Sequence, residues 1–225
     1  MTAPTAATAW AGRTADRSPS VRRSRDRSVR QAKVLVDAAR RLVAEEGDSF
    51  TINDLVKEAG VSLQTFYRYF SGKDELLLAV LEDLIQEGCD GSRARVADMH
   101  DPVDRLHGHL TSVFALLDES PESRAGARFV ANEHWRLSRA MPDELALAVR
   151  PFADMVGTEI ATATAAGSLR SSDPERDAWL VTQLVLSVFH QHAYRTTSDP
   201  EAARDVWRFC LAALGGRDRE PGTDR

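Results

Sequence analysis

The stretch TINDLVKEAGVSLQTFYRYFSGK, residues 51–73, predicts two short helices joined by a tight turn. Thr51 and Asp54 form a capping-box-like pair that can satisfy free amide groups at the start of the first helix. Gly60 ends this helix, because glycine adopts the left-handed conformation of a helix C-terminus without steric cost. Ser62 can cap the second helix through its hydroxyl. Two helices joined in this way form a helix-turn-helix, whose second helix can enter the major groove of DNA.

The second helix, residues 63–70, is predicted to have a buried face and an exposed face. Phe66 and Phe70 lie four positions apart and can anchor the helix to the core of its domain. The other side chains can reach bases and phosphates, and Lys73 in the next helix is a natural phosphate contact. The outward set is Gln64, Thr65, Tyr67, Arg68 and Tyr69. The alternative is an ordinary corner between two helices of an all-helical protein.

The longer segment TINDLVKEAGVSLQTFYRYFSGKDELL, residues 51–77, resembles the DNA-binding signature of the tetracycline-repressor-like (TetR) regulators of bacteria. The matching positions are Thr51, Ala59 to Val61, Tyr67 to Phe70, Lys73 and Leu76. Two positions depart mildly from the family pattern, since Val56 replaces a small alanine and Tyr69 replaces a frequent histidine. The specific resemblance covers about residues 30–85.

The resemblance implies DNA-contacting roles for Thr51, Thr65, Tyr67 and Lys73. The complete predicted DNA-binding set is Thr51, Ser62, Gln64, Thr65, Tyr67, Arg68, Tyr69 and Lys73. The resemblance also implies a C-terminal domain that binds a small hydrophobic effector. In such proteins the ligand displaces the fourth helix and changes the separation of the two recognition helices.

Composition indicates a soluble, folded protein of one or two domains, with 225 residues of which 43% are hydrophobic. No stretch approaches the roughly 20 apolar residues of a membrane span, and the N-terminus lacks the apolar core of a signal peptide. We therefore expect a cytoplasmic protein without a membrane partner. Cys89 and Cys210 are far apart and lack metal-ligand spacing, so they indicate neither a disulfide framework nor a zinc site.

Charge is distributed unevenly along the chain. The formal net charge is −5, but residues 1–75 carry 13 basic and 10 acidic side chains, a net of +3. This asymmetry favours DNA contact at the N-terminal end. Residues 1–27 are rich in arginine and lack apolar periodicity, so we expect a disordered basic arm. The arm could enter the minor groove or be a solvated tail without function, and both possibilities stay open.

The fold class predicted for the whole chain is all-α. We expect a helix-turn-helix domain over residues 28–75, a helical ligand-binding and dimerisation domain over 76–216, and a disordered tail over 217–225. A linking helix is expected from Lys73 to about Glu87, ended by Gly88 and Gly91. A capping residue followed by proline marks four further helix starts. These are Asp101-Pro102, Ser120-Pro121, Asp173-Pro174 and Asp199-Pro200, and the expected helices span 102–118, 121–139, 143–166, 174–194 and 200–214. Pro151 is expected to kink or split the third of them.

The last two helices are apolar on more than one face, so two separate surfaces have to cover the apolar faces of each helix. One face can meet the protein's own core while the other meets a second copy of the chain, which predicts a homodimer. The predicted interface residues are Leu184, Val188, Gln191, Trp207 and Leu211. The alternative is a monomer that buries both helices in its own core.

The central helices carry more aromatic surface than a compact bundle needs, which favours a ligand pocket between them. The predicted lining is Leu110, Phe114, Phe129, Trp135, Phe152, Met155 and Trp179, with Glu133 and Gln183 as polar groups. The alternative is a closed core in which these side chains pack against each other.

Features of an enzyme are scarce. His107 and His109 lie two positions apart, as do His190 and His192, and this spacing points the two rings of a pair in different directions on a helix. No Walker loop, nucleophile elbow or dinucleotide fingerprint occurs, so we expect no catalytic residue, metal or cofactor. The sequence predicts a dimeric DNA-binding repressor that a small hydrophobic ligand releases. A DNA-binding dimer without a ligand, a helical enzyme and a metal sensor are the alternatives.

Overall fold

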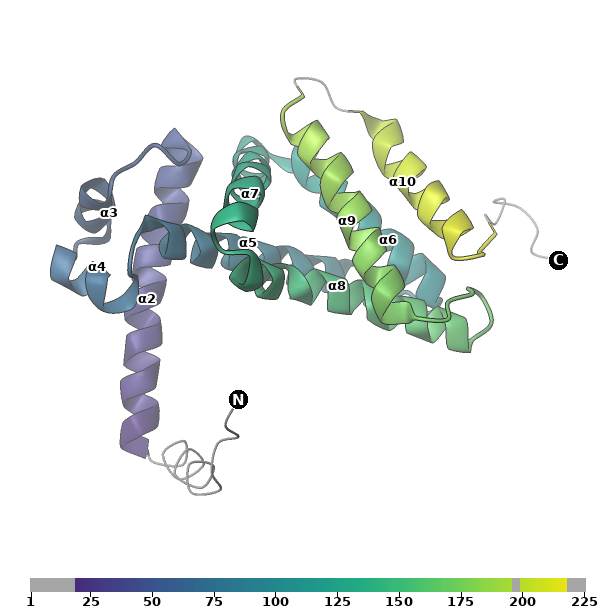
Figure 1. Cartoon of the computed structure of the whole chain (residues 1–225), viewed down its shortest axis with the longest axis horizontal. Coiled ribbons are helices and arrows are strands. Elements are labelled where there is room, and N and C mark those ends of the chain that lie inside the picture. The colour runs from purple at the N-terminus through teal and green to yellow at the C-terminus, as the bar shows by residue number, and fades with distance from the viewer. Residues whose placement is uncertain (1–18, 196–198, 218–225) are drawn as a thin grey trace.

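The computed structural model describes residues 19–195 and 199–217, and it is helical throughout, with no strand in these ranges (Figure 1). The all-α prediction is therefore confirmed. The helices are α2 (Pro19–Glu46), α3 (Ile52–Ala59), α4 (Leu63–Tyr69), α5 (Lys73–Val96), α6 (Pro102–Glu119), α7 (Pro121–Ala140), α8 (Pro142–Ala165), α9 (Pro174–Ala193) and α10 (Pro200–Ala213). No helix in the described ranges is long and apolar enough to cross a membrane.

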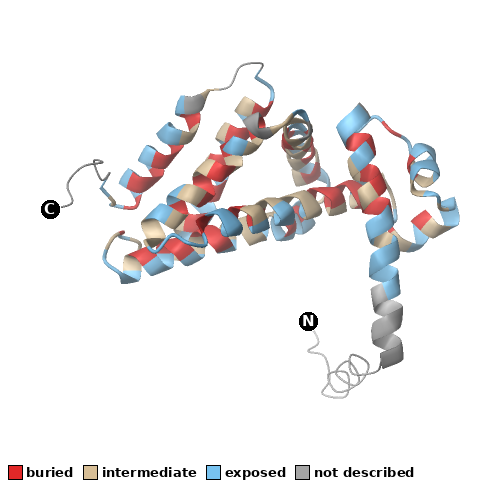
Figure 2. Ribbon diagram, turned by 180° about the vertical axis from the view of Figure 1, so that it is seen from behind, coloured by how far each residue is buried: buried red, intermediate tan, exposed pale blue. Residues whose placement is uncertain are grey.

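The helices form a small N-terminal group and a larger bundle, connected by α5. Figure 1 shows α2, α3 and α4 at one end of the molecule and α9 and α10 at the other, with α5 and α8 running along the middle. The buried residues form two hydrophobic clusters, and Figure 2 shows them on the inward faces of the helices. The N-terminal cluster includes Phe129 and Leu137 of α7 and Leu145 of α8. The small domain thus shares its core with the bundle, as expected for a unit too short to bury enough surface alone.

The four predicted cap-proline starts are confirmed. Asp101, Ser120, Asp173 and Asp199 each accept a hydrogen bond from a backbone N–H group in the first turn of the following helix. Proline follows directly in every case, where its missing N–H costs no hydrogen bond.

Two helix boundaries, the start of α2 and the end of α5, differ most from the sequence prediction. The first helix begins at Pro19 rather than near Ser28, so residues 19–27 of the predicted disordered arm are helical. Proline favours the first turn of a helix, and the four arginines that follow within residues 20–27 are good helix formers. Residues 1–18 of the arm and 218–225 of the predicted tail lie outside the described residues.

The linking helix α5 continues through both predicted stop glycines and ends at Val96. A glycine inside a helix costs about 1 kcal/mol, and here the burial of Cys89, Ser92 and Val96 in the next turns outweighs that cost. Pro151 lies inside α8 without splitting it. Packing along α5 and α6 holds this helix together despite the hydrogen bond that proline cannot donate.

Candidate nucleic-acid interface and ligand cavity

The first helix of the predicted motif is closed by its own side chains at both ends. The backbone N–H of Thr51 donates to Asp54 Oδ2 at 2.9 Å, and the backbone N–H of Asp54 donates to Thr51 Oγ1 at 3.2 Å. The hydrogen bonds from the Thr51 hydroxyl and backbone lower the pKa of Asp54. Gly60 has a φ of 65°, the left-handed conformation that ends α3 and turns the chain into α4.

Helix α4 has the buried and exposed faces that its sequence predicts. Ser62 caps it by accepting from the backbone N–H of Thr65 at 3.1 Å. Phe66 is fully buried and Phe70 is nearly so. On the opposite side the exposed residues are Gln64, Tyr67 and Arg68, whereas Thr65 and Tyr69 are half-buried. The Tyr69 hydroxyl donates to Gln31 Oε1 of α2 at 3.0 Å, which fixes α4 against the first helix.

Lys73 has a structural role that the sequence did not reveal. Its ammonium donates to the backbone carbonyl of Phe50 at 2.6 Å and to that of Asp48, and it lies 4.4 Å from the centre of the Phe50 ring. The start of α5 is thereby tied to the loop before α3. These two hydrogen bonds use two of the three ammonium protons, so only the third proton can donate to a phosphate.

The first turn of α5 is capped differently from that of α3. The backbone N–H and the hydroxyl of Ser71 both donate to Glu75 Oε2, at 2.6 and 2.8 Å. Asp74 lies three positions after Ser71, as Asp54 does after Thr51, but it instead accepts from Arg136 Nη1 of α7 at 2.6 Å. This hydrogen bond joins the N-terminal end of α5 to the bundle.

Residues 35–80 match the family model described as bacterial regulatory proteins, tetR family. This chain carries a TetR-family DNA-binding domain. Curated relatives are named as helix-turn-helix transcriptional regulators. EthR of Mycolicibacterium smegmatis is 36% identical over 114 residues, which cover 49% of this chain and 52% of EthR. YvaF of Bacillus subtilis, an uncharacterised regulator, is 49% identical over 47 residues, which cover 21% of this chain and 25% of YvaF. These matches thus span about half the length of the relatives or less.

Solved structures resemble the chain over most of its length. A TetR-family regulator from a Rhodococcus species has a TM-score of 0.63 at 23% identity, covering 82% of this chain and 98% of that one. FadR of Thermus thermophilus in complex with lauroyl-CoA has a TM-score of 0.66 at 20% identity, covering 85% and 99%. RolR in complex with resorcinol has a TM-score of 0.64 at 17% identity, covering 85% and 91%. These likenesses establish that the whole described chain, and not only the TetR-family domain, has the fold of such regulators.

The predicted aromatic pocket is not assembled as one lining. Leu110 and Phe114 are buried in the bundle core, with Phe152 packed against it, whereas Phe129 lies in the other cluster. Trp135 is 64% exposed and Trp179 is 47% exposed, and Gln183 is exposed as well. The prediction was wrong for these three, because helical spacing tells which residues share a face but not which face is covered.

Glu133 is fully buried, yet it belongs to an ion pair and not to a cavity. Its Oε2 accepts from Arg136 Nη2 at 2.5 Å and Nε at 2.8 Å. Because Arg136 also binds Asp74, one guanidinium connects a buried carboxylate of α7 to the first turn of α5.

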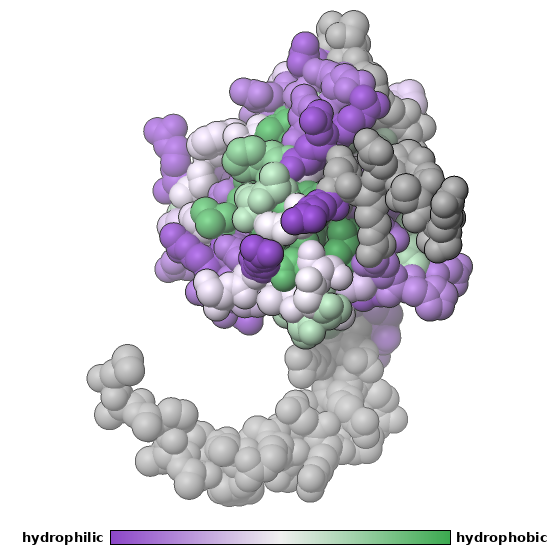
Figure 3. All heavy atoms as spheres, turned by 90° about the vertical axis from the view of Figure 1, so that its right-hand side faces the viewer, coloured by the Kyte–Doolittle hydropathy of each residue, from purple (hydrophilic) through white to green (hydrophobic). Residues whose placement is uncertain are grey.

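The predicted dimer residues divide into two groups. Trp207 and Leu211 are buried in the core of their own chain, so the prediction that α10 presents them to a partner was wrong. Leu184 and Val188 of α9 are half-buried against that core, and Gln191 is exposed. The large apolar side chains exposed on α9, at its C-terminal cap and on α10 are Trp179, Leu180, Tyr194 and Phe209. Figure 3 shows apolar surface bordered by polar side chains on the side of the molecule that carries α10.

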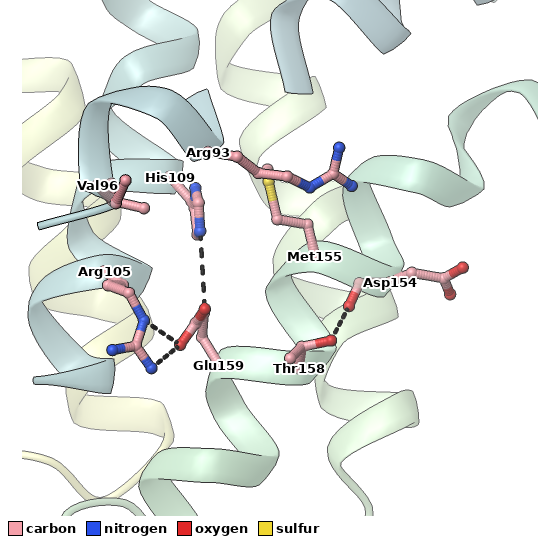
Figure 4. A pocket seen from close by; sticks show the side chains of 9 residues that line it. Arg93, Val96, Arg105, His109, Asp154, Met155, Thr158 and Glu159 are labelled. Atoms are coloured by element: carbon pink, nitrogen blue, oxygen red, sulfur yellow. Dashed lines mark hydrogen bonds and ion pairs between the residues drawn. The ribbon is translucent and has the colours of Figure 1, made fainter. Parts of the chain in front are cut away.

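A cavity of about 330 Å³ lies between α5, α6 and α8 (Figure 4). Its lining is Arg93, Val96, Ala97, Arg105, His109, Asp154, Met155, Thr158 and Glu159. Met155 is the one member of this set that the sequence prediction included. His109 and Glu159 are both buried polar residues, and the signal for them was their position within apolar stripes. His109 follows Leu106 by three positions, and Glu159 follows Met155 by four.

Two further histidines meet between α7 and α9. The rings of His134 and His190 are 4.9 Å apart, and neither His134 Nδ1 nor His190 Nε2 has a hydrogen-bond partner in the described ranges. Burial lowers the pKa of both, that of His190 to about 4, with His134 adding to the effect on His190. No group of three or more potential metal ligands is found among the described residues.

Proposed function

We propose that the protein is a DNA-binding transcriptional regulator with α4 as its recognition helix. The observation that carries the proposal is the exposed face of α4, which presents Gln64, Tyr67 and Arg68 while Phe66 fixes the helix from behind. An amide, a phenol and a guanidinium are groups that bind base edges and phosphates. The match of residues 35–80 to the TetR family supports this assignment.

The regulator acts as a homodimer in this proposal. Leu180, Tyr194 and Phe209 are half or more exposed on the last two helices, and a second copy of the chain would cover such a surface. A two-fold dimer presents two recognition helices to half-sites about 34 Å apart, one turn of DNA. A protein that sediments as a monomer at micromolar concentration would contradict this part.

A small molecule releases the repressor from its operator by shifting the bundle. The solved structures of FadR with lauroyl-CoA and of RolR with resorcinol support a ligand-responsive repressor by analogy. In this chain α5 runs from the DNA-binding end to the cavity, so displacement at Val96 can reach Lys73 along one helix. The ligand must bind the released state more tightly, by about 1.4 kcal/mol for each tenfold loss of operator affinity.

The test begins with selection of protein-bound fragments from the source genome, followed by salt titration of the best fragment. Replacing Arg68 with Ala is expected to lower the salt dependence by about one unit of slope, because one phosphate contact is lost. Replacing Gln64 with Ala is expected to change the preferred bases instead. Arg204, which pairs with Glu201 on the exposed side of α10, gives the control R204A with unchanged binding. Normal affinity, salt slope and sequence preference in both α4 variants would refute the assignment of α4.

Lys73→Ala tests both the proposed phosphate contact of this lysine and its structural contact with the loop before α3. The variant is expected to weaken binding to all sequences and also to lower the melting temperature, because the ammonium ties α5 to the loop carbonyls. A DNA-binding dimer without any ligand is the alternative function. It is favoured if the protein binds the selected fragment but no compound in a small-molecule screen raises its melting temperature.

A further inference from the structure

The cavity between α5, α6 and α8 has balanced charge. Arg93 and Arg105 line it together with Asp154 and Glu159. Val96, Ala97 and Met155 supply apolar surface around these groups. Arg105 pairs with Glu159 inside the cavity, whereas the exposed Arg93 and Asp154 pair outside the lining with Asp90 and Arg150. Each charged group of the lining therefore already has a counter-charge. A neutral molecule is the ligand that such a lining favours.

Glu159 presents one unused oxygen to this cavity. Its Oε2 accepts from Arg105 Nε at 2.9 Å and pairs with Arg105 Nη2 at 2.8 Å. Its Oε1 has no hydrogen bond within the described ranges and lies 3.9 Å from His109 Nε2, too far for a direct bond. Figure 4 shows the imidazole and the guanidinium converging on the carboxylate from α6. This carboxylate oxygen can therefore accept a hydrogen bond from a molecule in the cavity.

His109 faces Glu159 with a proton on Nε2. Its ring is 2% exposed, and Nδ1 lies 2.8 Å from Ser92 Oγ of α5. The single Ser112 proton has two acceptors, Ser92 Oγ at 3.0 Å and the backbone carbonyl of His109 at 2.9 Å, so the serines do not fix the tautomer. The Glu159 carboxylate, 3.9 Å from Nε2, favours the tautomer whose proton lies on Nε2 and faces the negative charge. Burial lowers the pKa of His109, so the neutral ring carries its single proton on Nε2. The imidazole therefore offers a donor toward the cavity.

The donor and the acceptor are spaced for one shared oxygen atom. An oxygen about 2.8 Å from both His109 Nε2 and Glu159 Oε1 fits within their 3.9 Å separation. A hydroxyl group can accept from the imidazole and donate to the carboxylate at the same time. An ether can only accept, and a carboxylate would meet Glu159 with like charge.

We propose that this cavity binds a small neutral alcohol or phenol, with its hydroxyl between His109 Nε2 and Glu159 Oε1 and its apolar frame against Val96 and Met155. This inference rests on the proposed function, because it identifies the effector site and the chemical class of the effector. The hydroxyl bridge contacts α5 through Ser92 and His109, so the ligand acts on the helix that begins at Lys73.

The test compares three probes of one shape by calorimetry near neutral pH. The β isomers of naphthol, methoxynaphthalene and naphthoate share an aromatic frame but differ in hydrogen bonding and charge. Naphthol is expected to bind at least about tenfold more tightly than either of the others, because a site built around a hydroxyl rejects analogues without one. Equal affinity for naphthol and methoxynaphthalene would overturn the proposal. Failure of all three to bind folded protein would overturn it too, since water alone would then fill the gap.

Two variants separate the hydroxyl bridge from a general effect on folding. Glu159→Gln is expected to weaken naphthol binding about tenfold or more while changing methoxynaphthalene binding less than about twofold. Thr162→Val is the matched control, since Thr162 lies on the same helix one turn beyond the cavity lining, and its hydroxyl donates to the backbone carbonyl of Thr158. The control is expected to bind both probes as the wild type does. Equal losses for both probes in Glu159→Gln would assign Glu159 a merely structural role and refute the bridge.

Operator binding is measured on the same preparations, so the two proposals can fail separately. Protein that binds selected DNA but discriminates none of the probes refutes the effector class and leaves the regulator intact. Protein that prefers naphthol but binds no DNA refutes the regulator and leaves the cavity assignment standing.

Discussion

The helix-turn-helix and the bundle satisfy their polar groups in different ways. In α3 and α4 the capping partners are three positions apart, as in Thr51 with Asp54 and Ser62 with Thr65. In the bundle the decisive partners are distant along the chain, as in Arg105 with Glu159, 54 positions away. The first region is therefore locally determined, whereas the second depends on helices that must assemble before any of these contacts exist.

The difference affects how each region tolerates change. Loss of a local cap weakens one helix end. Loss of one partner of a buried long-range ion pair leaves the other charge buried without a counter-charge, which costs more. The long-range pairs of the bundle thus couple its helices, but they also make its stability sensitive to the loss of a single partner.

The largest effect is expected at the buried anchor of α4. Phe66 is fully buried, so Phe66→Ala should lower the free energy of unfolding by about 3–5 kcal/mol through the cavity it creates. Urea denaturation measures this, and DNA binding should fall with it. Phe209→Ala, at a side chain 65% exposed, is the control and should change stability by less than about 0.5 kcal/mol in the monomer. A loss below about 1 kcal/mol for Phe66 would contradict its role as the anchor.

Acid should destabilise the bundle through its buried histidines. The pKa of His190 is about 4 in the folded protein against about 6.5 when unfolded, so the unfolded state binds more protons between these values. Stability is complete above about pH 6.5 and is lost as the pH falls toward 4, by about 3 kcal/mol for this residue. His134 is the ionisable neighbour that faces His190 and lowers its pKa further.

Urea denaturation between pH 7 and pH 4 tests this expectation. His190→Phe removes the titrating group and should flatten the pH dependence by about the same amount. If the wild type and the variant lost stability in parallel, the acid effect would have to come from other groups.

Arg136 pairs with one buried carboxylate, Glu133, and with one exposed carboxylate, Asp74, so the two contacts can be compared. Arg136→Ala leaves Glu133 buried without its partner and should cost about 2 kcal/mol, less than for a fully buried pair because the Arg136 side chain is 36% exposed. Asp74→Ala removes the other partner of the same guanidinium, but its side chain is 54% exposed, so the loss should stay below about 1 kcal/mol. Chemical denaturation of both variants gives the comparison, and equal losses would show that the buried pair has no special weight.

The smallest effect is expected at the helix caps, and it should be alike in both regions. Thr51→Ala and Asp101→Ala each remove one side-chain acceptor at a helix start, with an expected loss of about 1 kcal/mol. Melting curves of the two variants are compared directly. A loss at Thr51 together with none at Asp101 would mean that tertiary packing, not capping, holds the start of α6.

Sequence patterns predicted the elements that depend on neighbouring residues. The start of α6 at Pro102, the left-handed Gly60 and the buried face of α4 are all as expected. The same reasoning ended α5 too early at Gly88, because a local breaker signal was weaker than the packing of the next turns. It also assigned Trp179 to a pocket although that ring is exposed, since a periodic stripe does not reveal its partner.

By itself, the sequence determined the all-α class and the helix-turn-helix, because caps, turns and helical periodicity act over three or four residues. Only the tertiary structure brought His109 and Glu159, 50 positions apart in the chain, to 3.9 Å across a cavity and tied Asp74 to a buried carboxylate through Arg136. The physical reason is one of range. A hydrogen bond within a helical turn is fixed by local geometry, whereas a contact between helices depends on how every intervening element packs.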